Sequence, residues 1–358
     1  MTALHEVRTP APTDLEVVDR LLGATCDLPA WRVAELANRG GILATWLSTM
    51  EARGVRLGAQ ARAYLARVRQ RTADLHALGA DLSAAHGLGV LKGERIARHL
   101  PAPLLRQSGD VDLVAPGEAP LWECVRDLRS RFDAAVQGVS VLDRGTGPLQ
   151  IMVAVKWPAS EPFLDKPMGV DVTTFAFGGD FREVPLRVTA PGDEDLANVL
   201  AVTEERFQRR FRVKDRLDLL TLAAVLERRL GDDVIEVVSD AAATYALAPE
   251  LRRLIGGTRE WVPVSARWQR IFEVLGPLAR EEKARRRPGR PGVHRLRYGY
   301  PLDPGAGGGG TVRVHPRPGG DVASTPVGPC LLTERLVVED QQLATAIEFA
   351  RSLVKPPS

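Results

Sequence analysis

The sequence predicts an α+β fold, with a strand-rich region between two helical segments of the chain. Short apolar or alternating runs typical of strands occur at residues 89–91, 111–114, 151–157 and 170–177. Helical periodicity precedes this region and returns after Pro191–Gly192. We therefore expect a small mixed sheet with interleaved helices, α/β-like in its core and flanked by helical N- and C-terminal segments.

The composition is typical of a globular protein. The 358 residues are 44% hydrophobic and 26% charged, and the net charge is +3, which favours a packed core and gives no indication of nucleic-acid binding. No run approaches the roughly 18–20 apolar residues of a membrane-spanning helix, and the N-terminus lacks the features of a secretion signal. Cys26, Cys124 and Cys330 are too widely spaced for a disulfide framework or a zinc cluster. These features predict a cytoplasmic protein with reduced thiols and no membrane partner.

The N-terminal segment, residues 1–88, is predicted to be helical. Between Gln60 and Leu78, apolar or small residues recur with i, i+3, i+4, i+7 spacing. Asp14 is suited to cap an earlier helix. The strand-rich core is expected to cover residues 89–190, with one helix over Leu121–Phe132.

A second helical domain is predicted over residues 191–285. Asp193 is a suitable N-cap at its start, and Gly231 can end a helix in the left-handed conformation. Beyond it, residues 286–358 contain many Gly and Pro residues. We expect a loosely ordered extension that ends in an amphipathic terminal helix.

Three aspartates in apolar strands are the strongest chemical signal in the sequence. Asp110 and Asp112 stand at i and i+2, so a strand directs both to one face, about 7 Å apart. Like charges so placed repel each other and need a cation or free solvation. Asp171, in another apolar strand, could complete a site for two Mg²⁺ ions. All three are therefore candidate metal ligands and catalytic residues.

Residues near these aspartates are candidates for nucleotide binding. Gly93 follows a strand and would let the backbone approach a phosphate, while Lys92 and Arg106 could supply positive charge. Structural salt bridges are the alternative role for both cations, and Lys214 could pair with Asp218 one helical turn away. The complete predicted nucleotide-binding set is Lys92, Gly93, Arg106, Ser108, Gly109 and Lys214.

The run LKGERIARHLPAPLLRQSGDVDLV resembles the signature of the uncharacterised nucleotidyltransferase family, within the DNA polymerase β-like superfamily. That superfamily has a strand and a Gly-containing turn, then a D-x-D strand, then a third acidic strand. Gly93, the Asp110/Asp112 pair and Asp171 match those positions. Two features depart from the pattern: Glu94 follows the glycine where the superfamily has a small Ser, and Thr173–Thr174 follow the third acid where family members often carry His.

The resemblance implies a polymerase-β-type core and a Mg²⁺-dependent nucleotidyltransferase. Such an enzyme would move NMP, with ATP the expected donor, to a hydroxyl or similar acceptor on a small molecule, a peptide or protein, or RNA. Asp110 and Asp112 would hold the two ions, and Asp171 would complete the catalytic-metal site. The alternative is a catalytically silent binding or scaffold protein on the same fold, in a biosynthetic pathway or a toxin–antitoxin system.

Overall fold

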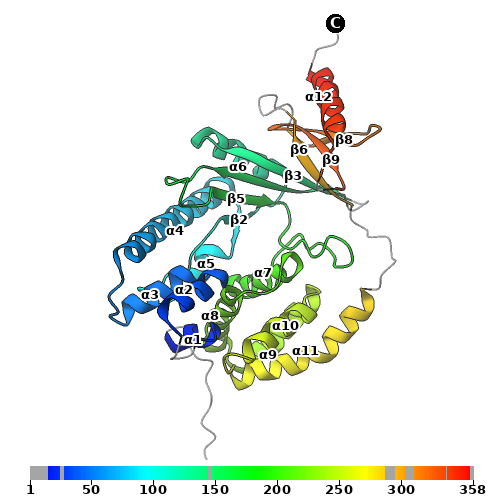
Figure 1. Cartoon of the computed structure of the whole chain (residues 1–358). Coiled ribbons are helices and arrows are strands. Elements are labelled where there is room, and N and C mark those ends of the chain that lie inside the picture. The colour runs from blue at the N-terminus through cyan, green and yellow to red at the C-terminus, as the bar shows by residue number, and fades with distance from the viewer. Residues whose placement is uncertain are drawn as a thin grey trace, which may run out of the picture. The chain divides into compact units, whose positions relative to one another are not determined.

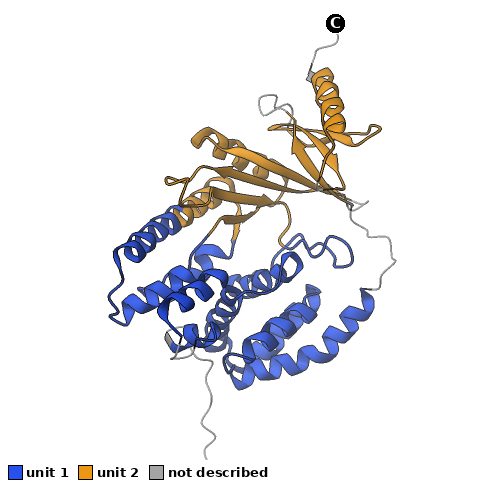
Figure 2. Cartoon of the chain, viewed as in Figure 1, with its two compact units in different colours: residues 1–74, 91–108, 177–290 blue, residues 75–90, 109–176, 291–358 orange. Residues whose placement is uncertain are grey.

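The chain has an α+β fold (Figure 1). The computed structural model describes residues 15–24, 28–143, 147–286, 295–302, 310–335 and 337–354. Two compact units form, one from residues 1–74, 91–108 and 177–290, the other from residues 75–90, 109–176 and 291–358 (Figure 2). Each unit thus draws on three separate stretches of chain, unlike the successive segments expected from the sequence. None of the described helices is both long enough and apolar enough to cross a membrane.

The first unit is helical. Its core includes Leu47, Leu65 and Leu220, which are contributed by three different helices. Helix α4 (Ala59–His86) begins in this unit and passes into the second at residue 75. The other helices of the unit are α1 Leu15–Leu21, α2 Ala30–Arg39, α3 Leu43–Ala52, α5 Gly93–Ala97, α7 Glu194–Gln208, α8 Val213–Leu230, the 3₁₀ turn η1 Gly231–Asp233, α9 Val234–Thr244, α10 Ala248–Arg259 and α11 Ala266–Arg285.

Two of the predicted helix ends are confirmed in this unit. The Asp193 carboxylate caps α7 by accepting hydrogen bonds from the backbone N–H groups of Asp195 and Leu196, both at 3.0 Å. Gly231 follows α8 with φ +58°, a conformation that L side chains rarely adopt. The predicted cap Asp14 lies outside the described residues.

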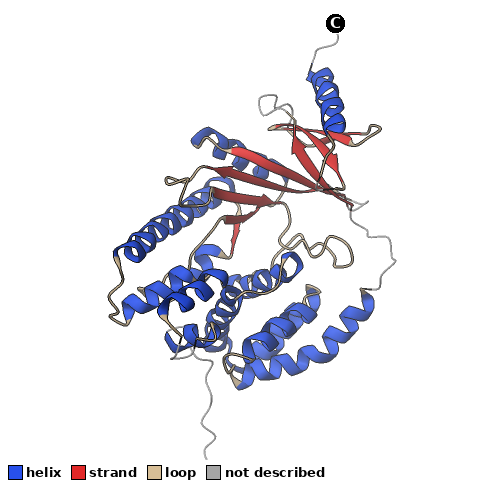
Figure 3. Ribbon diagram, in the orientation of Figure 1, coloured by secondary structure: helices blue, strands red, loops and turns tan. Residues whose placement is uncertain are grey.

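The second unit contains a nine-stranded sheet with the order β1-β2-β5-β4-β3-β6-β9-β8-β7 (Figure 3). Strands β2 and β5 pair in parallel, whereas successive pairs from β5 to β7 along the sheet are antiparallel. The strands are β1 Gly89–Leu91, β2 Val111–Val114, β3 Ala135–Asp143, β4 Gln150–Trp157, β5 Met168–Thr173, β6 Arg295–Pro301, β7 Arg313–His315, β8 Asp321–Thr325 and β9 Gly328–Thr333.

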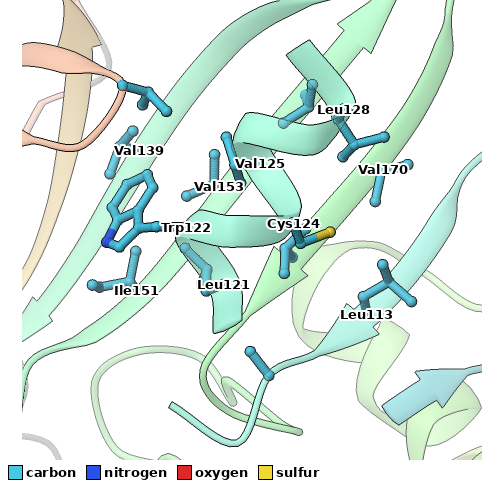
Figure 4. Close-up of a cluster of buried hydrophobic side chains, with 14 of the residues drawn as sticks. Leu113, Leu121, Trp122, Cys124, Val125, Leu128, Val139, Ile151, Val153 and Val170 are labelled. Atoms are coloured by element: carbon cyan, nitrogen blue, oxygen red, sulfur yellow. The ribbon is translucent and has the colours of Figure 1, made fainter. Parts of the chain in front are cut away.

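One face of the central strands forms the core of the sheet unit. Valines alternate with more exposed residues along β4 and β5, so that Val153, Val170 and Val172 are fully buried. Helix α6 (Glu118–Arg131) covers this face with Trp122 and other side chains (Figure 4). The same alternation directs the polar residues of these strands to the opposite face.

The predicted loosely ordered extension is wrong for residues 295–302 and 310–333. Strands β6 and β9 join the central sheet, and Cys330 and Leu332 are buried in its core. Gly299 lets β6 approach β3 closely, since a Cβ there would stand 2.3 Å from the Val139 carbonyl oxygen. Helix α12 (Asp340–Val354) then packs Ala346 on this C-terminal part. The sequence predicted a small sheet, whereas the structure has a sheet of nine strands.

The two described cysteines, Cys124 and Cys330, are free thiols in the core of the sheet unit. Burial raises the pKa of each to about 12. Both thiols therefore stay protonated and unreactive at neutral pH.

Candidate functional site

Two of the predicted aspartates are neighbours on the polar face of the sheet. Asp112 on β2 and Asp171 on β5 are register partners across the parallel pair. The residues on either side of each, such as Val111 and Val172, point into the core, while both aspartates are partly exposed. Neighbouring strands lie about 4.8 Å apart, so these two carboxylates project side by side.

Asp110 directly precedes β2 and lies on the same face. Its Cβ stands 3.9 Å from the position that a Cβ on Gly169 would occupy. Gly169 thus brings the backbone of β5 close to Asp110 without a side chain between them. Lys156 on β4 pairs with Gly169, and its Cγ lies 3.6 Å from that same position. A lysine thus stands in the same row across the sheet as Asp110.

The donor chemistry of this face fits a hard divalent cation, because carboxylate oxygens are the ligands that Mg²⁺ prefers. Among the described residues, however, no group of three or more His, Cys, Asp and Glu side chains is close enough to hold a metal ion. The backbone of Asp110, Asp112 and Asp171 is already aligned on one face. For all three carboxylates to share a metal site, their side chains would have to adopt other rotamers.

The threonines that follow Asp171 are engaged in the structure of the sheet. Thr173 Oγ1 donates to the Phe175 carbonyl at 2.6 Å. Thr174 Oγ1 donates to Gln150 Oε1 and accepts from the Ile151 backbone N–H, both at 2.9 Å. Neither hydroxyl replaces the histidine of the family pattern as a general base.

Lys92 lies in the helical unit, in a strained turn. It has φ +57° and ψ −134°, outside the usual regions for a residue with a side chain. Its backbone N–H donates to Asn198 Oδ1 at 2.6 Å, and its Nζ donates to Glu205 Oε1 at 2.7 Å. Burial acts to raise the pKa of Glu205, but Lys92 and Arg209 together bring it below its usual value. These contacts favour the salt-bridge role for Lys92.

Arg106 forms a buried bidentate ion pair with Asp218. Its Nε and one terminal nitrogen donate to the two Asp218 oxygens at 2.7 and 2.8 Å, and the other terminal nitrogen donates to the Gly93 carbonyl at 3.3 Å. The exposed fractions of Arg106 and Asp218 are 5% and 3%. This arginine joins the first residue of α5 to helix α8, and the geometry favours a structural role over contact with a phosphate.

The remaining predicted residues are divided between the units. Ser108 is buried in the helical unit, where Lys214 is the second residue of α8, and Gly109 begins the second stretch of the sheet unit. Arg209, five residues before Lys214, is paired close by in sequence, since it donates to both oxygens of Asp215 at 2.6 and 2.9 Å.

Sequence reasoning thus placed the aspartates on one face but missed the residues that surround the candidates. Lys156 could have been singled out because lysine is rare in this chain, occurring at only six of 358 positions. Glu205 and Asn198 gave no local signal, since they contact Lys92 from more than 100 residues away. Asp218 was expected from its spacing to pair with Lys214, but its hydrogen bonds go to Arg106, 112 residues earlier.

No protein-family model matches the chain, and neither the curated proteins nor the solved structures contain a match. The functional argument therefore depends on the carboxylate face itself.

Proposed function

We propose that this chain is a Mg²⁺-dependent nucleotidyltransferase with a polymerase-β-type core, which moves NMP from an NTP, with ATP the expected donor, to a hydroxyl or similar acceptor. The observation that supports it most is the register pairing of Asp112 with Asp171 on the polar face, with Asp110 beside them. Carboxylates on neighbouring positions of one face act as like charges on each other, and a bound divalent cation would offset that repulsion. An oxygen-only donor set on a sheet face suits divalent ions that carry phosphates.

Each residue has a defined part in this proposal. Asp110 and Asp112 would hold the two ions, and Asp171 would complete the catalytic-metal site and take the proton of the attacking hydroxyl. Bound Mg²⁺ would supply positive charge to the phosphates and to the leaving pyrophosphate. Lys156, in the row of Asp110, would add positive charge toward the phosphates.

The testing experiment compares Asp110→Asn, Asp112→Asn and Asp171→Asn with the parent. Asn keeps size and shape but removes an anionic ligand, so the variants should fold while Mg²⁺–ATP binding weakens and turnover falls by orders of magnitude. Asp171→Asn should reduce turnover more than affinity. Calorimetric titration with Mg²⁺–ATP measures binding, and pyrophosphate release from each of the four NTPs measures turnover.

Asp133→Asn is the matched control, because Asp133 is an exposed aspartate of the same unit outside this face. It should bind and turn over like the parent. If the three site variants bind Mg²⁺–ATP as tightly as the parent, these carboxylates are not the nucleotide site and the proposal fails.

A non-catalytic binding protein on the same fold is the second candidate. The buried pairing of Arg106 with Asp218 favours it, because it assigns a predicted phosphate ligand to the protein's own structure. The same titration separates the two: a scaffold protein would show no Mg²⁺-dependent NTP binding and no pyrophosphate release in the parent.

A further inference from the structure

The loop between β4 and β5 presents an apolar tip to solvent. Phe163 is 99% exposed and its neighbour Leu164 is 66% exposed. Burying one phenyl ring typically contributes about 1.5–3 kcal/mol, so a phenyl ring left almost wholly in solvent beside a second exposed apolar residue is a candidate contact point. We call this loop, residues 158–167, the knob.

The knob is held in shape before any contact is made. Three of its ten residues are prolines, at 158, 162 and 167, which restrict the backbone. A turn holds its tip, because the backbone N–H groups of Leu164 and Asp165 both donate to the Glu161 carbonyl, at 3.0 and 2.8 Å. A preorganised loop loses little entropy on binding.

A cavity large enough for one aromatic side chain, which we call the hole, lies in the same unit. It is a mainly apolar cavity of about 220 Å³. Its lining includes Ala135 and Val136 at the start of β3, Pro301 at the end of β6, Cys330 on β9 and Arg129 on α6. The cavity forms where β3 carries a bulge between Val136 and Gly138, before its pairing with β6 begins at Val139.

The cavity volume identifies a class of occupant. Small-molecule sites usually measure about 300–1,000 Å³, so a nucleotide would not fit. An apolar cavity of about 150 Å³ can hold benzene, so one phenyl ring fits well.

Charge supports the same occupant. Arg129 is the charged residue of the lining, whereas the knob carries Glu161, Asp165 and Lys166 and so has a net charge of −1. A knob with a net negative charge is complementary to a hole with a basic rim.

Knob and hole lie at the same end of the central strands. The knob follows Trp157, the last residue of β4, and Ala135 of the hole pairs with Lys156 of that strand. When a surface carries two complementary features close together, a two-fold axis can satisfy both at once, since each copy then offers its knob to the other's hole.

We infer that this end of the sheet unit is a homodimer interface, in which Phe163 of each copy inserts into the cavity beside Arg129 of the other. Two buried aromatic side chains of about 150–250 Å² each, with their neighbours, place the contact at the low end of specific interfaces. The dimer should therefore be reversible and concentration-dependent, and it does not depend on the proposed transferase activity.

Sedimentation equilibrium of the full chain between 1 and 200 µM tests this inference. The parent should show a monomer–dimer equilibrium, and Phe163→Ser should weaken it at least tenfold. Arg129→Glu and Glu161→Arg should each weaken it, and the double variant should restore it because the opposite charges then face each other again. Thermal unfolding of each variant confirms that it is folded.

Val337→Ser is the matched control, because Val337 is 80% exposed but belongs to neither the knob nor the hole. It should dimerise like the parent. A parent that stays monomeric at 200 µM, one that forms open-ended assemblies larger than a dimer, or a Phe163→Ser variant that dimerises normally would overturn the inference.

Discussion

Asp112 and Asp171 are register partners on adjacent parallel strands, and the residues beside them point into a fully buried apolar core. A carboxylate at either position cannot move to the other side of the sheet, because a slip of one residue would place valines in solvent and aspartates in the core. The packing of the sheet therefore keeps two like charges side by side.

A double-mutant cycle with Asp112→Asn and Asp171→Asn should reveal this repulsion. Without divalent cations, we expect an unfavourable coupling of about 1 kcal/mol in the free energy of unfolding, as befits two charges about 5 Å apart near water. Urea unfolding measures it, and added NaCl should reduce it. Zero or favourable coupling at low salt would show that the two carboxylates do not interact as the register indicates.

Breaking the Arg106–Asp218 pair should destabilise the helical unit strongly. Asp218→Asn leaves a buried guanidinium without its counter-ion, at an expected cost of about 3–5 kcal/mol. Arg106→Lys should also be costly, because an ammonium cannot reproduce the bidentate geometry. Chemical denaturation gives both values. Exposed Arg270→Lys is the control and should change stability by less than about 0.5 kcal/mol.

Asp193 should make stability depend on pH on the acid side. Burial acts to raise its pKa, but Arg229 and the backbone N–H groups at the start of α7 bring it below its usual value. A lowered pKa means that the carboxylate stabilises the folded state fully above about pH 4, and that this contribution is lost as pH falls through the lowered value.

The variant Asp193→Asn isolates this charge, since Asn also caps helices well. The parent should exceed the variant in free energy of unfolding near neutral pH, and the two should converge in strong acid. Thermal or urea unfolding at several pH values between 7 and 2 checks this. A constant difference across that range would mean that the charge of Asp193 plays no part.

Truncation after Arg286 should destroy the sheet unit. It removes β6 to β9, and with them Cys330 and Leu332 from the core, and it leaves β3 as an open edge. We expect aggregation or loss of cooperative unfolding, measured by light scattering and circular dichroism. Deletion after Val354 is the control and should leave the protein soluble. A soluble 1–286 fragment of parental stability would contradict the role assigned to these strands.

The edge of the sheet that contains β1 and β2 can be predicted from local sequence. The runs at 89–91 and 111–114 match β1 and β2 residue for residue, because short apolar strands between turn residues leave a clear local pattern. Strands β6 and β9 have a weaker local sequence pattern. Glycine and proline interrupt them, and the partner that makes β6 a strand is β3, more than 150 residues earlier.

The candidate site can likewise be predicted only in part from the sequence. The spacing of Asp110 and Asp112 predicts a shared face, since it depends only on the two-residue period of a strand. The contacts of Lys156 and Asp218 could not be found from spacing, because they depend on strand register and on the approach of α8 to a loop more than 100 residues earlier.

The pairing of β3 with β6 also has a consequence for synthesis on the ribosome. At typical rates of about 5–20 residues per second, β6 emerges on the order of ten to thirty seconds after β3. During that interval the nascent chain carries an unpaired strand edge next to an incomplete core, which is the kind of surface that chaperones bind. Slow or interrupted translation between residues 143 and 295 should therefore lower the yield of folded protein even when the sequence is unchanged.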